Sequence, residues 1–115
     1  RDKLITTAVR AIADMRDGYR PPAIPTFTLP GRGLLDQMSA FMDKGIADGL
    51  FFPHDKTVAM EIATIVVNTQ GDDPIEVTEQ EMFARERTAF IALAKTPQTL
   101  ARITSMLDTG NVIRN

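Results

Sequence analysis

The chain has no cysteine and no tryptophan, and it has a single histidine among its 115 residues. Without cysteine it cannot form disulfides, thiolate metal sites or cysteine nucleophiles, and this usage is typical of a reducing compartment, so we expect a cytoplasmic protein. One histidine leaves only carboxylates as further metal ligands, and the spacings of calcium loops and zinc-binding helices are missing. We therefore expect no metal site.

The chain also lacks a strong excess of charge and a long apolar run. It carries 13 Lys and Arg against 15 Asp and Glu, for a formal net charge of -2. Nucleic acids and anionic lipids attract proteins with a concentrated positive face, so this balance disfavours both partners. The apolar runs fall far short of the roughly 18 residues of a membrane span. The length suits one domain, too short for a dinucleotide-binding unit plus a substrate domain.

Five segments repeat apolar residues at spacings of three and four, which predicts five amphipathic helices. These segments cover about residues 3–17, 34–46, 55–66, 78–93 and 96–109. The second should fray or end near Gly45 and Gly49. The β-branched residues between 58 and 67 leave a buried strand open as the alternative to the third helix. We predict an all-α fold, with the five helices in a single small bundle that makes residues 1–115 one domain.

Two helix starts carry side-chain signatures. Thr78 and Glu81 match a capping box, in which each side chain satisfies a backbone N–H near the other residue. Thr96 followed by Pro97 matches a cap with proline at the first helical position, where its missing N–H costs nothing. We therefore expect the fourth and fifth helices to begin at these residues.

The segment between the first two helices, residues 19–31, contains four prolines. Proline lacks an N–H and biases its predecessor toward extended geometry, which predicts an extended connector. Ile24, Phe27 and Leu29 alternate within it. We therefore expect the connector to lie against the bundle.

Two short motifs could carry chemistry. His54 next to Asp55 suits a general base, because a carboxylate can orient the imidazole. Adjacent residues rarely face each other, however, and Asp55 is better explained as a helix N-cap. Gly31-Arg32-Gly33 ahead of a helix has the look of a phosphate-binding turn, but the third glycine and preceding strand of a dinucleotide fingerprint are missing. We interpret both motifs as structural.

The remaining polar residues favour structural interpretations too. Charges at Glu79, Glu81, Arg85, Glu86 and Arg87 are typical of a solvated, ion-paired helix face. The Met and Phe stripes are expected in the core. Neither serine considered as a nucleophile, Ser39 or Ser105, has a histidine nearby in the sequence. We therefore predict no catalytic, cofactor-binding or metal-binding residue in this chain.

The order of several short motifs resembles the C-terminal helical region of the multifunctional 3-hydroxyacyl-CoA dehydrogenase/enoyl-CoA hydratases of fatty-acid β-oxidation. The resemblance spans nearly the whole chain and departs at Arg85, where leucine is usual, and at residues 111–113, where Lys-Pro-Leu is usual. The motifs are Gly18-Tyr19-Arg20-Pro21-Pro22, Pro30-Gly31, His54-Asp55, Glu79, Arg85-Glu86-Arg87 with Phe90, and Thr99, Arg102, Ile103, Met106, Leu107, Thr109, Gly110, Arg114 and Asn115.

The resemblance implies that the chain is the C-terminal fragment of a larger oxidoreductase of lipid metabolism, for which NAD is the expected cofactor. None of the matched positions is catalytic in that family, so it also implies a noncatalytic domain that supports packing or assembly of the catalytic domains and is inactive alone. Other domains of the enzyme would be its partners, and a second copy of the chain is a further candidate.

Two alternatives remain open. One is a stand-alone α-helical interaction module whose exposed apolar groove binds a partner helix. The other is contact with the phosphates of an acyl-CoA, since arginine forks suit phosphate oxygens. The candidate residues for that contact are Arg10, Arg16, Arg20 and Arg32.

Overall fold

A computed structural model describes residues 2–115 and the side chains of residues 3–115. Five helices confirm the mostly helical fold that the apolar spacing predicts. The stretch after His54 is helical up to Ile65, so the alternative of a buried strand there is wrong. The elements are α1 (Asp2–Met15), β1 (Thr26–Leu29), α2 (Gly33–Ala47), α3 (Pro53–Ile65), β2 (Ile75–Thr78), α4 (Glu79–Ala94) and α5 (Pro97–Thr109).

The packed part of the molecule is built around α3, which contacts α2 on one side and α4 on the other. Its core is small. Val67, just after α3, is fully buried, and the other buried apolar residues come from β1, β2 and the three central helices. They are Leu29, Met42, Ala63, Val77 and Ala89.

A two-stranded antiparallel sheet, which the periodicity does not predict, closes one end of this core. β1 pairs with β2 so that Thr26 faces Thr78 and Leu29 faces Ile75. The alternation in the connector is therefore that of a strand, with Leu29 facing inward at 3% exposure. Its partner strand lies almost fifty residues further along the chain, and strand formation depends on such cross-strand packing more than on local preference.

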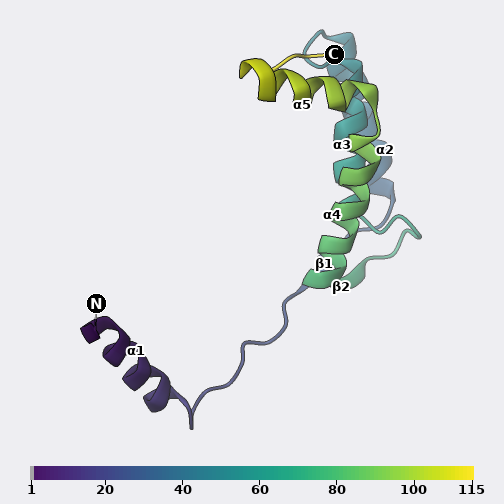
Figure 1. Cartoon of the computed structure of the whole chain (residues 1–115). Helices are drawn as coiled ribbons and strands as arrows, with labels where there is room; N and C mark the ends of the chain where they lie inside the picture. Colours follow the sequence, from purple (N-terminus) through teal and green to yellow (C-terminus); the bar gives the residue numbers. More distant parts are fainter. Residues whose placement is uncertain (1) are drawn as a thin grey trace.

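α1 stands apart from the other four helices at the end of an extended linker (Figure 1). Every residue from 3 to 28 is exposed, so the expectation that the connector lies against the bundle is wrong for residues 19–25. The radius of gyration is 21.5 Å, whereas a compact domain of this length has about 13 Å. The accessible surface is 8961 Å², against about 6,200 Å² for a typical folded monomer of this mass.

The second helix differs from its prediction at Gly45. This glycine is buried inside α2, and a Cβ built there would lie 2.2 Å from the ring of Phe51. Gly45 therefore makes room for Phe51 and does not fray the helix. α2 ends at Ala47, and Gly49 follows in the left-handed region with φ 74°.

Both predicted helix caps are confirmed. The Thr78 hydroxyl accepts from the Glu81 N–H at 3.3 Å, and the Glu81 carboxylate accepts from the Thr78 N–H at 2.7 Å. The Thr96 hydroxyl accepts from the Thr99 N–H at 3.3 Å. α5 ends at a left-handed Gly110, as expected for a glycine after the last helical turn.

Candidate functional site

His54 lies in the first turn of α3 and is 5% exposed. Its Nε2 atom shares a hydrogen bond of 2.8 Å with the hydroxyl of Thr99, in the first turn of α5. The Thr99 hydroxyl is in turn 2.9 Å from the hydroxyl of Thr96, the N-cap of α5. The imidazole therefore joins two helix starts that are distant in sequence.

Asp55 makes a second link between the same two helices. Its carboxylate accepts from the Phe52 N–H at 2.9 Å and from Arg102 Nη2 at 2.8 Å. Arg102 also donates through Nε to the Asn115 side chain at 2.8 Å and through Nη2 to the Asn115 carbonyl at 3.1 Å. We call His54, Asp55, Thr99, Arg102 and Asn115 the α3–α5 polar cluster.

The α3–α5 polar cluster is suited to holding helices together. The carboxylate of Asp55 is engaged by a backbone N–H and a guanidinium, and the imidazole of His54 by a threonine. A general base needs an imidazole oriented toward a substrate proton and a group that steers it. The arrangement fits the structural interpretation of His54-Asp55, with Asp55 acting at the third position of α3 rather than as its N-cap.

The environment of Asp55 lowers the pKa of its carboxyl group below the ordinary value. The hydrogen bond from the Phe52 N–H is the largest cause, and the hydrogen bond and charge of Arg102 add to it, while partial burial opposes them. A carboxyl with a lowered pKa in the folded state stabilises the fold above its unfolded pKa of about 3.9, and this stabilisation disappears as the pH falls through the folded value.

Asp55→Asn should therefore flatten the acid side of the stability profile. Between pH 6 and pH 3, the free energy of unfolding should fall more steeply for the wild type than for Asp55→Asn, because the amide takes up no proton in this range. Urea titrations at a series of pH values measure the slope. Asp36→Asn, at an exposed carboxylate on α2, is the control and should keep the wild-type slope; equal slopes for Asp55→Asn and wild type would contradict the prediction.

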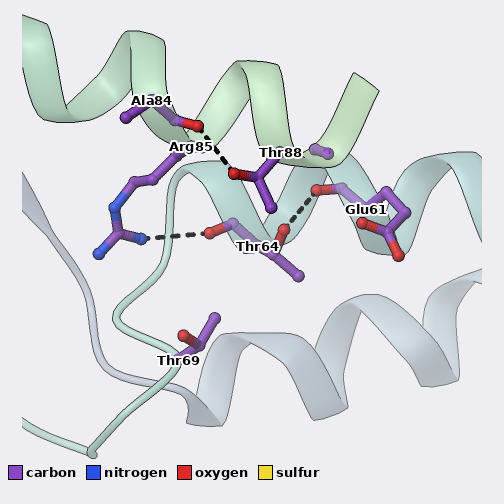
Figure 2. A pocket seen from close by; sticks show the side chains of 7 residues that line it. Glu61, Thr64, Thr69, Ala84, Arg85 and Thr88 are labelled. Atoms are coloured by element: carbon purple, nitrogen blue, oxygen red, sulfur yellow. Dashed lines mark hydrogen bonds between the residues drawn. The ribbon is translucent and has the colours of Figure 1, made fainter. Parts of the chain in front are cut away.

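A groove of about 570 Å³ runs between α3 and α4. Figure 2 shows Arg85 reaching across it from α4 to the end of α3. Arg85 Nη1 donates to the carbonyl oxygens of Thr64 at 3.3 Å and Val67 at 3.0 Å. The groove is lined by Glu61, Thr64, Thr69, Ala84, Arg85, Thr88 and Ala89.

This placement corrects the predicted role of Arg85. The residue was expected on a solvated, ion-paired face, but it is half-buried and caps the carbonyl end of α3. Glu79, Glu86 and Arg87 are exposed as predicted, but the predicted ion pairs are wrong, because none of the three forms one among residues 3–115. Two threonine hydroxyls of the groove, those of Thr64 and Thr88, donate to carbonyls of their own helices. The guanidinium that could have served a ligand is thus already committed to the backbone.

The Gly31 turn serves as a packing junction. The Arg32 N–H donates to the Gly71 carbonyl at 2.9 Å, and the Arg32 side chain lies 3.5 Å from the Asp72 carboxylate. A phosphate would compete there with a carboxylate of its own sign. A Cβ at Gly31 would lie 1.8 Å from the Asp72 carbonyl oxygen, so this position needs glycine for close backbone approach.

The other candidate residues are not brought into one site. Arg10 lies on α1 and Arg20 on the linker, whereas Arg32 lies at the start of α2. Arg16 pairs with its neighbour Asp17. The hydroxyl of Ser105 donates to the Asn111 carbonyl at 3.0 Å, and Ser39 lies in α2, whereas the imidazole of His54 is bonded to Thr99.

Within residues 2–115, no group of three or more His, Asp or Glu is placed to hold a metal ion. Among the helices that the structure describes, none is long and apolar enough to cross a bilayer.

Comparison with known proteins relates the chain to a dehydrogenase. The chain is similar to a probable 3-hydroxyacyl-CoA dehydrogenase of Bacillus subtilis (strain 168), with 27% identity over 116 residues. The match covers the whole of this chain. It spans only 15% of the length of that protein. This similarity supports a relation to the 3-hydroxyacyl-CoA dehydrogenase family without assigning the chain to a particular region of it. No family model and no solved structure matches the chain.

Proposed function

We propose that the chain is a noncatalytic helical domain of a fatty-acid β-oxidation 3-hydroxyacyl-CoA dehydrogenase/enoyl-CoA hydratase, and that it supports packing of the catalytic domains. The observation that carries the proposal is the apolar surface that the chain leaves uncovered. Its elements form an open, C-shaped arrangement with α1 at one tip and α5 at the other (Figure 1). Such a shape suits a segment that lies along a larger body.

α1 is the clearest docking element. Its apolar stripe is between 55% and 75% exposed along its whole length, at Leu4, Ile5, Val9, Ile12 and Met15. A 14-residue helix is marginally stable in water by itself, and amphipathic helices gain most of their stability by packing the apolar face. α1 therefore requires a partner surface, and the α2–α5 body does not supply it.

α5 presents a second uncovered stripe. Leu100, Met106 and Leu107 are 49%, 47% and 79% exposed. On another side, the α3–α5 polar cluster holds α5 against the start of α3. A helix that is held by polar contacts on one side and carries an exposed apolar stripe on another is well placed to pack against a neighbouring domain.

The noncatalytic assignment rests on the fold of the described residues, which does not suit binding of a dinucleotide cofactor. Hydride transfer to NAD needs a fold that binds the dinucleotide, and the residues described here do not fit one. The one candidate turn is closed by the Asp72 backbone, and the two strands of the sheet pair antiparallel, whereas a dinucleotide-binding unit is built on parallel strands. We accordingly expect NAD to bind other domains of the parent enzyme. The name of the Bacillus subtilis relative, a probable 3-hydroxyacyl-CoA dehydrogenase, supports a dehydrogenase as that parent.

Hydrogen exchange tests the docking directly. In the full-length enzyme that carries this sequence, the α1 amides should be protected, and in the isolated 115-residue chain they should exchange as in an open helix. Val9→Asp/Ile12→Asp should remove the protection in the full enzyme, because two carboxylates would enter the apolar contact. Thr7→Asp/Arg10→Asp, which places the same two groups on the polar face, is the matched control.

Two results would contradict the proposal. One is α1 amides that exchange equally fast in the full enzyme and in the isolated chain. The other is turnover of 3-hydroxyacyl-CoA with NAD by the isolated chain, which should show none.

A further inference from the structure

The outer face of α4 combines two exposed aromatic rings with two charges. Phe83 is 56% and Phe90 64% exposed, and together with Glu86 and Arg87 they line a shallow hollow of about 530 Å³. Arg85 and Ala89, which face α3, lie on the other side of the helix, since successive residues turn by about 100°. We call Phe83, Glu86, Arg87 and Phe90 the α4 outer face.

Neither charge of this face is used inside the chain. Among residues 3–115, no ion pair or side-chain hydrogen bond involves Glu86 or Arg87. The Phe rings likewise have no aromatic neighbour within the described chain, where the one ring pair is Phe41 with Phe51. The charged and aromatic side chains of the α4 outer face are therefore available to a binding partner.

The spacing of the four residues is symmetric. Phe83 and Phe90 lie at equal distances in sequence on either side of the Glu86–Arg87 bond. If a second α4 lies antiparallel across the first, with a two-fold axis at this bond, Phe83 meets Phe90 of the second copy and Glu86 meets Arg87 of the second copy. Each contact then occurs twice, as an isologous interface requires.

We propose that the α4 outer face is a two-fold interface between two copies of this chain, which goes beyond the docking of α1 and α5. Charge complementarity selects the antiparallel arrangement, because a parallel pair would oppose Glu86 to Glu86 and Arg87 to Arg87. The two Phe–Phe contacts supply the apolar part.

Charge reversal tests the interface by sedimentation equilibrium of the 115-residue chain. The wild type should be a dimer, and Glu86→Arg or Arg87→Glu alone should raise the dissociation constant by roughly tenfold or more, because each creates two like-charge contacts. An equimolar mixture of the two variants should dimerise again, since each charge then meets its opposite. The double variant Glu86→Arg/Arg87→Glu should dimerise by itself for the same reason.

The restored mixture separates an interface from a folding defect, and circular dichroism checks that each variant keeps its helices. Asp14→Arg, an equal charge reversal on the polar face of α1, is the control and should leave the dissociation constant unchanged. Phe83→Ala/Phe90→Ala should give a folded monomer. A wild type that stays monomeric, a dimer indifferent to the single reversals, or a mixture that fails to recover would each overturn the proposal.

Discussion

Replacing Gly31 with alanine should lower the free energy of unfolding by roughly 3 kcal/mol, in the upper part of the range for overpacking. The new Cβ would lie 1.8 Å from the carbonyl oxygen and 2.3 Å from the carbonyl carbon of Asp72. Both are backbone atoms, so relief requires the loop to move and to loosen the bond from the Arg32 N–H to the Gly71 carbonyl. Urea unfolding followed by circular dichroism measures the loss.

Gly33→Ala provides the matched control two residues away. A Cβ at Gly33 meets nothing within 4 Å, and its φ does not lie in the left-handed region. Alanine there should leave stability unchanged or raise it by up to about 1 kcal/mol, by restricting the unfolded chain. Equal losses for the two variants would mean that the close approach between Gly31 and Asp72 does not govern the effect.

Arg102→Met should cost about 2 kcal/mol of unfolding free energy, between the values for exposed and buried ion pairs. The side chains of Arg102 and Asp55 are 24% and 29% exposed, and methionine keeps the apolar stem while losing every donor. Asp55 then keeps its charge without the guanidinium, and Asn115 loses two hydrogen bonds. Urea titration at pH 7 measures the change.

The comparison for Arg102 is Lys44→Met on α2. Lys44 pairs with Asp48 at 2.5 Å, but the two side chains are 76% and 46% exposed. Such a pair contributes about 0–1 kcal/mol, so the variant should lie close to the wild type. In addition, Asp55→Asn and Arg102→Met should be non-additive, since they remove the same contact. Additive losses would show that Asp55 and Arg102 act independently.

The sequence alone determined the local part of this protein. Each helix is visible as a three-four repeat, because its apolar face recurs within a few residues. The starts at Thr78 and Thr96 are visible for the same reason, since cap and capped N–H lie three residues apart. The order of short motifs also indicates a resemblance to the 3-hydroxyacyl-CoA dehydrogenases, and the chain is similar to one such probable enzyme at 27% identity.

Tertiary structure decided which of these local elements meet. The pairing of β1 with β2 and the bond between Asp55 and Arg102 join residues more than forty positions apart, and no periodicity encodes such a pair. From the sequence, Gly31 is interpreted as part of a loop and Gly45 as a helix end. The atoms that require glycine at these positions belong to Asp72 and Phe51, and the local pattern does not reveal these contacts. The separation of α1 is equally non-local: its apolar stripe predicts burial, but only the arrangement of the other helices shows that this chain leaves the stripe uncovered.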